Sequence, residues 1–374
     1  MNAGHQVISN DGPTPKQLGY RMPAEWEPHQ ATWVSWPHKE GSWPGKLESI
    51  ERTFAEMVIV LSRSETVRVN VCDTGMKSRV QRCLGAAGTA GDVQFHTIPT
   101  DDAWCRDCGA VFIKRDMTGD TDDSLMDAAN VAALAAIDFG FNSWGEKYPP
   151  YQLDNALAAR MAESLGVPRF DGRMILEGGS IDVNGDGLLL TTESCLLNSN
   201  RNPHLGRDDI EQRLRDLLGI DSVLWLSEGI AGDDTDGHVD DLARFVSEDT
   251  IVTVVEENCD DVNYPALAQN LDRLNSLASS SSPALDIVPL PMPPPVTYEG
   301  ERLPASYANF YIANTVVLVP AFHEPTDRRV IELLQSIFTG REVVAIDCTD
   351  LVWGLGAFHC LTQQVPACDW IGRR

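Results

Sequence analysis

An internal repeat constrains the fold of this 374-residue chain more than any other feature of its sequence. In the clearest copy, an apolar run at 180–183 is followed by a turn at 184–187 and a second apolar run at 188–191. A helical stripe of isoleucine and leucine then ends at Gly219, and a third apolar run covers 223–226. Period-2 and period-3.6 patterns in this order predict a unit of strand, strand, helix and strand.

The same order recurs elsewhere in the chain. Later copies open at Leu242 and Phe310, and weaker copies open at Ala31 and Ala110. One such unit cannot bury its apolar face alone, whereas a closed ring of units buries every face at once. We therefore predict an α/β fold in which roughly five units form a five-fold pseudosymmetric propeller around a central site.

Composition favours a single soluble enzyme-sized domain over residues 1–374. No low-complexity segment is long enough to link independent domains, and an acidic run at 116–123 and a proline-rich run at 289–295 predict surface loops. No apolar stretch reaches the length of a membrane span, and no secretion signal opens the chain. The predicted compartment is the cytoplasm, which also fits nine cysteines without a paired framework.

Charge indicates the kind of partner. Fifty-five acidic residues against 29 basic ones give a formal net charge of −26. A field of that sign repels phosphate backbones and attracts small cations, so we expect a cationic small molecule, no nucleic acid and no membrane. Homo-oligomerisation is left open by the sequence.

Polar side chains recur at one place in successive units, just ahead of the first strand or within it. These residues are Asp107, Glu177, His238 and Asp240, with Cys360 in a predicted closing strand at 358–362. If the units surround an axis, equivalent positions converge on it. We therefore expect these side chains to share one pocket.

The chemistry of this set is specific. Cys360 is a candidate nucleophile, and His238 could act as its base and later as an acid. Asp107 and Asp240 offer the two carboxylates that hold a planar guanidinium through paired hydrogen bonds. Glu177 is a third acid, and crowded carboxyl groups raise one another's pKa, which suits a proton carrier.

Several motifs taken together resemble the agmatine deiminases of the guanidine-modifying pentein superfamily, which are related to bacterial peptidylarginine deiminases. They span nearly the whole chain: MPAEWEPH at 22–29, DAW at 102–104, RDCG at 106–109, EGGS at 177–180, LLN at 196–198, NRNP at 200–203, DTDGHVD at 234–240, ASYANFYIAN at 305–314 and HCLTQQ at 359–364. The resemblance implies a hydrolase that acts on linear amidines.

The resemblance also implies a role for each residue. Cys360 would attack the guanidinium carbon of agmatine and form an S-alkylthiouronium. His238 would pass a proton to the departing ammonia and activate water, with support from Glu177. The substrate-binding residues would be Asp107, Asp240 and Trp104. The product would be N-carbamoylputrescine, a step toward putrescine in polyamine biosynthesis, and no metal or organic cofactor would be needed.

One segment departs from the family pattern. Where the pattern reads Gly-Gly-Gly-Asn-Ile-His-Cys, this chain has GLGAFHC at 354–360. Beside the expected pocket, Ala357 replaces an asparagine and Leu355 replaces a glycine. The length and polarity of the substrate tail are therefore not fixed by the resemblance. Another guanidino compound, a peptidyl arginine, or transfer of the amidino group to an amine is therefore an alternative to agmatine hydrolysis.

A hypothesis from a different class is a calcium-binding module. Residues 182–193, from Asp182 to Glu193, satisfy the EF-hand loop pattern. An EF-hand needs a helix on each side, but the flanking runs read as strands, so a hairpin turn is favoured. No further ligands accompany His238 and Asp240, and no metal site is predicted.

Neighbouring histidines and cysteines receive structural interpretations. His359 should point to the opposite face of the strand from Cys360. His38 has no partner in the local sequence and is expected to have a loop or capping role, and Cys72 is expected to be an ordinary core or surface cysteine.

Overall fold

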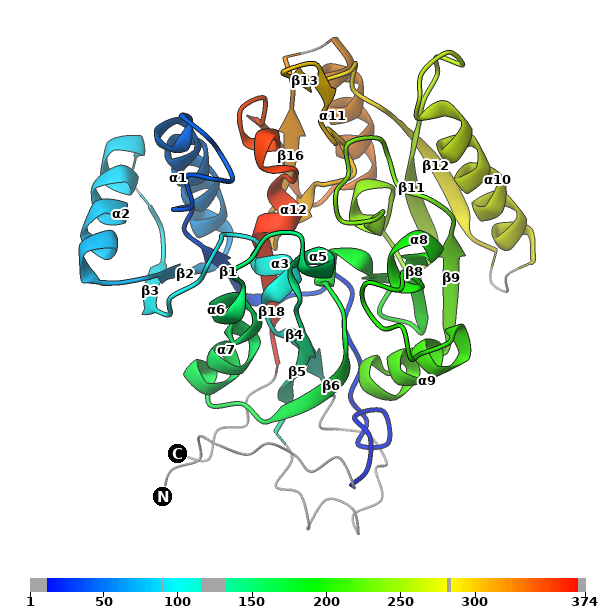
Figure 1. Ribbon diagram of the computed structural model, residues 1–374, viewed down its shortest axis with the longest axis horizontal. Coiled ribbons are helices and arrows are strands. Elements are labelled where there is room, and N and C mark those ends of the chain that lie inside the picture. Colours follow the sequence, from blue (N-terminus) through cyan, green and yellow to red (C-terminus); the bar gives the residue numbers. More distant parts are fainter. Residues whose placement is uncertain (1–11, 89, 116–131, 281–283, 324, 369–374) are drawn as a thin grey trace.

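The computed structural model describes residues 12–88, 90–115, 132–280, 284–323 and 325–368. Within them the chain forms a mixed α/β fold whose sheets are arranged side by side, with the longer helices on the outside (Figure 1). The predicted acidic loop at 116–123 lies outside the described residues.

Four three-stranded sheets repeat one connectivity. In each, the first two strands are antiparallel and the third is parallel to the second. Their strands are β4 (Val111–Lys114), β5 (Leu134–Gly140) and β6 (Arg169–Ile175); β7 (Asp182–Val183), β8 (Leu188–Thr192) and β9 (Ser222–Leu226); β10 (Ala243–Phe245), β11 (Thr250–Val255) and β12 (Asp286–Pro291); β15 (Tyr311–Ile312), β16 (Val316–Ala321) and β17 (Glu342–Asp347). The predicted repeat is therefore present in the described residues, and a separate short ribbon joins β13 (Thr297–Tyr298) to β14 (Glu301–Arg302).

A further sheet joins the two ends of the described chain. Its strands are β1 (His29–Ser35), β2 (Thr66–Val71), β3 (Val93–Thr97) and β18 (Thr362–Pro366), in the order β18-β1-β2-β3. β1 is parallel to β2 and antiparallel to β18. A strand from the C-terminal region thus completes the sheet that the N-terminal region begins, as Figure 1 shows in red and blue.

Helices connect the parallel strands, because a parallel pair needs a crossover. The longer ones are α1 (Leu47–Ser64), α2 (Thr74–Ala87), α7 (Leu157–Leu165), α9 (Arg207–Leu218), α10 (Tyr264–Ser280) and α11 (Pro325–Ile337). In α9 the predicted stripe of Ile210, Leu214 and Leu218 is buried. The helix ends at Gly219, whose φ of 71° is left-handed, as expected for a C-terminal glycine.

The proline-rich run was predicted to be a loop, and this prediction is wrong for its first part. β12 extends through Pro291, with Thr253 opposite Pro289 and Val255 opposite Pro291. β12 is an edge strand, so its open side requires no backbone N–H, and proline is tolerated there.

The turn at 184–187 joins two antiparallel strands, β7 and β8, which confirms the predicted hairpin. Asp182, the first residue of the EF-hand pattern, forms a buried ion pair with Arg244. The segment itself forms β7 and β8, and only the single-turn helices η1 (Gly178–Ser180) and α8 (Glu193–Leu196) flank it, so nothing here favours the calcium-binding alternative.

Among the described residues, no helix combines the length and the apolar character that crossing a bilayer requires.

Candidate active site

Four single-turn helices meet near the centre of the molecule. Each lies just before the first strand of a sheet, or before the closing strand: α3 (Cys105–Cys108) before β4, η1 (Gly178–Ser180) before β7, η2 (Val239–Asp241) before β10, and α12 (Phe358–Leu361) before β18. α12 contacts α3, α3 contacts η1, and η1 contacts η2. Because the predicted polar residues lie in these turns or next to them, the fold brings together residues from distant parts of the sequence.

Cys360 lies in a helical turn, so the predicted strand over 358–362 is wrong. The strand begins only at Thr362, and Asn309 explains why the turn forms. Its Oδ1 accepts hydrogen bonds from the backbone N–H groups of Ala357, His359 and Cys360 at 3.2, 3.1 and 3.3 Å. These N–H groups would be unsatisfied at the start of a helix without such an acceptor.

The thiol of Cys360 has two polar neighbours. Asn309 donates from Nδ2 to Sγ at 3.0 Å, and Asp240 Oδ2 lies 3.5 Å from the same sulfur. Sequence reasoning missed Asn309 as a site residue. The repeat could have found it, because Asn309 directly precedes the strand of its unit in the same way as the other polar residues do.

His359 and Cys360 lie in one helical turn and contact the same carboxylate, so the prediction that they face opposite sides of a strand is wrong. His359 Nδ1 lies 2.6 Å from Asp240 Oδ2, and its Nε2 lies 3.0 Å from Glu25 Oε2. Glu25 also pairs with Arg106 at 3.0 Å and with Arg244 at 2.9 Å. A buried network thus holds the Asp240 carboxylate from behind. The strand model failed here because alternation does not apply to a helical turn.

Asp107 is fixed by two donors from different segments. Gly179 donates its backbone N–H to Oδ1 and Trp144 donates Nε1–H to Oδ2, both at 2.9 Å. Gly179 also occupies the crowded centre of the site. A Cβ there would lie 2.7 Å from His238 Nδ1 and 2.9 Å from both Asp107 Oδ1 and Asp240 Oδ2. Three of the predicted residues therefore surround one glycine.

Glu177 joins this group through His238. His238 Nδ1 lies 3.8 Å from Asp107 Oδ1, and its Nε2 lies 3.9 Å from Glu177 Oε2. Arg201 donates from Nε to Glu177 Oε1 at 2.7 Å and so orients the carboxylate. Among the described residues, Glu177 Oε2 and both ring nitrogens of His238 have no hydrogen-bond partner, which leaves them available to a ligand.

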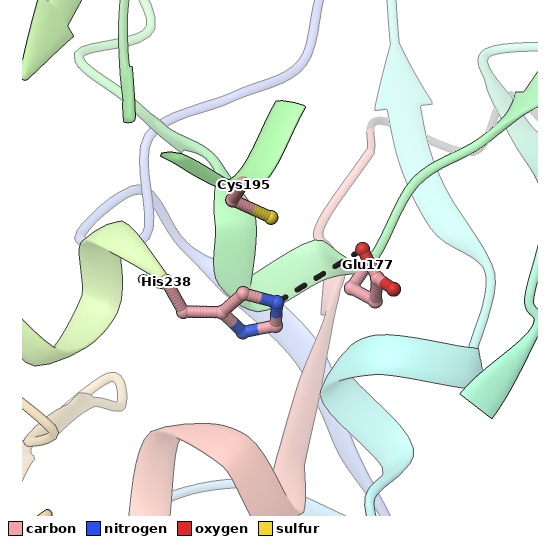
Figure 2. A group of neighbouring side chains, drawn as sticks. All are labelled: Glu177, Cys195 and His238. Atoms are coloured by element: carbon pink, nitrogen blue, oxygen red, sulfur yellow. Dashed lines mark ion pairs between the residues drawn. The ribbon is translucent and has the colours of Figure 1, made fainter. Parts of the chain in front are cut away.

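Cys195, in α8 (Glu193–Leu196), lies beside His238. Figure 2 shows its sulfur and the carboxylate of Glu177 near the same edge of the imidazole ring. Ligand atoms of Glu177, Cys195 and His238 all lie within 4.8 Å of one another, and all three residues are buried. By atom type this trio could hold a transition metal, whereas Asp240 is not part of it.

Burial and neighbouring acids govern the protonation of the cavity-facing groups. Burial, reinforced by Asp240, Asp241 and Asp107, raises the pKa of Cys360 well above its usual value, although the Asn309 amide opposes this. Burial also raises the pKa of Asp107. The charges of Asp240 and Glu177 add to this shift, whereas the charge of His238 opposes it. Both shifts favour the protonated forms of Cys360 and Asp107.

The deeper groups shift in the opposite sense. Burial alone would lower the pKa of His238, but the charge of Asp107, with Cys195 and Asp240, raises it well above its usual value. Burial alone would raise the pKa of Asp240, but the hydrogen bond and charge of His359 lower it. His238 is thus a proton donor and Asp240 a carboxylate in the resting site.

A cavity of about 350 Å³ opens onto these groups. Trp104, Asp107 and Cys360 line it directly, whereas His238, Glu177 and Asp240 lie deeper. Its aromatic walls are Trp104, Trp144, Tyr148 and Trp353. Apolar walls around a buried carboxylate and a thiol suit a flat cation whose central atom can be attacked by sulfur.

The segment that departs from the family pattern forms part of this wall. A Cβ on Gly354 would lie 2.6 Å from the Trp43 ring, and one on Gly356 would lie 2.7 Å from Trp104. Between them Leu355 lines the cavity with a φ of 70°, a left-handed conformation that favours glycine. The added bulk predicted from the sequence therefore reaches the cavity.

The chain is similar to known proteins. Residues 21–366 match the model of the Porphyromonas-type peptidyl-arginine deiminase family. The agmatine deiminase of Pseudomonas aeruginosa (strain UCBPP-PA14) is 35% identical over 383 residues, which cover 96% of this chain and 99% of that protein.

Two solved structures agree with this match. The agmatine deiminase of Enterococcus faecalis superposes with a TM-score of 0.86 at 30% identity and covers 97% of this chain and 99% of its own. A cysteine-to-serine variant of the C. jejuni agmatine deiminase, solved with substrate bound, gives 0.81 at 31% identity and covers 92% and 96%. The chain belongs to the Porphyromonas-type peptidyl-arginine deiminase family.

Proposed function

We propose that this protein hydrolyses a guanidine C–N bond of agmatine and releases N-carbamoylputrescine and ammonia. One observation carries the proposal: Cys360 and Asp107 line the same cavity, and Asp240 Oδ2 lies 3.5 Å from the sulfur of Cys360. Three relatives that are at least 30% identical over nearly their full lengths bear the name agmatine deiminase, and the structure of one of them holds substrate.

The substrate would bring a further positive charge into the site. A guanidinium between Asp107 and Asp240 offsets the negative charge that keeps Cys360 protonated, so substrate binding lowers the barrier to forming the thiolate. The thiol proton passes to a neighbouring carboxylate. Sulfur then attacks the guanidinium carbon, and its C–S bond forms as the C=N π bond opens.

His238 would complete both halves of the reaction. As the imidazolium it donates a proton to one amino group, which leaves as ammonia and yields the S-alkylthiouronium. The neutral imidazole then takes a proton from water, whose oxygen attacks the same carbon. The C–S bond breaks as the C=O bond forms and the hydroxyl proton passes to the released ammonia, the carboxyl group returns its proton to the sulfur, and the neutral ureido product departs. Glu177, held by Arg201, would support the imidazolium and the substrate.

The arrangement of the sheets supports a finer description of the fold. We infer a single catalytic domain over residues 1–374 whose five sheets form a five-fold pseudosymmetric propeller. The repeated strand order supports this, as does the position of Asp107, Glu177, His238, Asn309 and Cys360 ahead of strands in different sheets. A cytoplasmic enzyme supplying a precursor of putrescine fits the odd set of nine cysteines and the cationic substrate.

Product analysis tests the proposal. The purified protein is incubated with agmatine, arginine, shorter and longer guanidinoalkylamines, and a peptidyl arginine, and ammonia and ureido products are measured. We expect agmatine to give equal amounts of both. A new guanidine without ammonia would indicate amidino transfer, and a preference for peptidyl arginine would replace agmatine as substrate.

The nucleophile has a matched control. Cys360→Ala should keep the fold, as judged by circular dichroism, and remove turnover, whereas Cys259→Ala on an exposed turn should retain it. Turnover by Cys360→Ala at a rate close to that of the unmodified protein would disprove covalent catalysis by this residue.

A further inference from the structure

A second cysteine and histidine meet outside the candidate active site. Cys72, which follows β2, places Sγ 3.6 Å from His38 Nε2, on the loop that follows β1. Both residues are half-buried and so are partly open to solvent. The sequence predicted neither a contact nor a chemical role for them, because 34 positions separate them.

The contacts of His38 define its protonation. Nδ1 lies 3.0 Å from the carbonyl oxygen of Trp36, and Nε2 lies 3.1 Å from the carbonyl oxygen of Thr100. A carbonyl oxygen only accepts hydrogen bonds, so each ring nitrogen must carry a hydrogen. An imidazole with hydrogens on both nitrogens is an imidazolium cation.

The surroundings of Cys72 favour its thiolate. The imidazolium lies beside the sulfur, and Cys72 directly precedes the N-terminus of α2, a 14-residue helix whose positive end attracts anions. The negative charge of Asp73, the N-cap of that helix, opposes formation of the thiolate. Two charged residues on the loops that hold His38, Lys39 and Asp102, pair with each other at 3.4 Å.

The pKa shifts agree with this geometry. The hydrogen bond from His38 holds the pKa of Cys72 below its usual value, although burial opposes it. The same contact, against the effect of burial, raises the pKa of His38 to about 9.

We propose that Cys72 and His38 form a thiolate–imidazolium pair, and that Cys72 is a modification site for soft electrophiles and hydrogen peroxide. With peroxide, the thiolate attacks one oxygen, an S–O bond forms and the O–O bond breaks. Sulfur is oxidised by two electrons to a sulfenic acid while the peroxide is reduced. The departing hydroxide takes the Nε2 proton of His38 and leaves as water.

The site borders the cavity wall. Lys39 follows His38 in the chain, Asp102 lies two residues after Thr100, and both line the cavity. The pair is nevertheless distinct from Cys360, so the proposal does not depend on the reaction assigned to the cavity.

Labelling kinetics provide the test, with an internal control. The native protein is treated with iodoacetamide at pH 6.5, quenched at intervals and digested with trypsin. The peptides that contain Cys72 and Cys259 are then quantified by mass spectrometry. Cys259 is exposed whereas Cys72 is half-buried, so access alone favours Cys259. We expect Cys72 to react about tenfold faster, because only the thiolate is nucleophilic.

The variant His38→Gln keeps a hydrogen-bonding side chain without the charge. It should slow the labelling of Cys72 about tenfold at pH 6.5, as a rise of one pKa unit predicts, and leave the rate at Cys259 unchanged. An unchanged Cys259 rate and circular dichroism spectrum confirm that the variant folds. In urea, both cysteines should react at similar rates.

Peroxide treatment followed by dimedone should trap the sulfenic acid at Cys72 in the unmodified protein and less of it in His38→Gln. The proposal would be overturned if Cys72 were labelled no faster than Cys259. It would also be overturned if Cys72 were labelled at the same rate in the unmodified protein and in His38→Gln.

Discussion

His359 holds Asp240 from behind: its Nδ1 lies 2.6 Å from the carboxylate oxygen that also lies 3.5 Å from the sulfur of Cys360. The nucleophile and the histidine next to it in the chain therefore share one carboxylate. This relationship makes His359 a positioning residue for the proposed substrate clamp.

Replacement of this histidine should weaken substrate binding. His359→Gln leaves Asp240 and Glu25 with a poorer partner, and an unsatisfied buried acceptor costs about 1–3 kcal/mol. We expect kcat/KM for agmatine to fall roughly 10- to 100-fold, mainly through KM. Steady-state kinetics measure this, with His323→Gln on the surface as the control. Unaltered kinetics in His359→Gln would remove its positioning role.

Gly179 should not tolerate a methyl group. Gly179→Ala brings a Cβ to 2.7 Å from His238 Nδ1 and 2.9 Å from two carboxylates, so these side chains must move apart. We expect activity to fall at least about 100-fold while the thermal midpoint changes little, since misplacement by about an ångström has effects of this size. Gly340→Ala, with no atom within 4 Å of the added Cβ, should behave like the unmodified protein. A fully active Gly179→Ala would show that the centre of the site is looser than its distances indicate.

The cavity wall should control the length of the substrate tail. Leu355→Gly removes a side chain from the cavity and places glycine where φ is 70°. We predict that kcat/KM for longer guanidinoalkylamines rises severalfold relative to agmatine. Competition assays with paired substrates measure this ratio directly. A constant ratio would show that the tail does not contact this segment.

The buried arginine beneath the site should matter for stability more than a surface arginine does. Arg244→Met leaves Glu25 and Asp182 as buried carboxylates without their guanidinium, which costs about 3–5 kcal/mol. Urea denaturation measures the difference. Arg329→Ala, which removes an exposed ion pair with Glu257, should leave the free energy of unfolding unchanged. Equal stabilities for the two variants would contradict this ranking.

Asp154 should make stability fall as the pH rises. Burial raises its pKa to about 7, although the backbone N–H groups of Asp101 and Asp102 oppose the shift. A carboxyl group whose pKa is higher in the folded than in the unfolded state contributes stability fully below pH 3.8, and the contribution is lost as the pH passes about 7. Between pH 5 and pH 8, the free energy of unfolding of Asp154→Asn should therefore fall by on the order of 2 kcal/mol less than that of the unmodified chain. Urea denaturation at both pH values gives this double difference, and parallel losses in the two proteins would refute the assignment.

Sequence periodicity was sufficient to predict the repeated units but not their edges. The hairpin at 184–187 and the buried face of α9 follow from local patterns of apolar residues and turn glycine. β3 and α2 were missed, and β12 was predicted too short because proline rarely continues a strand. Only its position at a sheet edge makes proline acceptable there.

For the candidate site, the unit pattern placed five polar residues together, but local conformation was wrong where tertiary contacts decide it. Asn309 caps the turn that carries Cys360, and it lies 51 positions away in the sequence. No periodicity in the local segment contains that information. His359 was misplaced for the same reason, since its orientation depends on the turn rather than on its neighbours in the chain.

The pairing of β1 with β18 has a consequence for biosynthesis. A ribosome makes Cys360 about 325 residues after the end of β1, so the edge of β1 that β18 covers stays open throughout that interval. The proposed active site is therefore assembled only when β18, which directly follows Cys360, pairs with a strand synthesised much earlier.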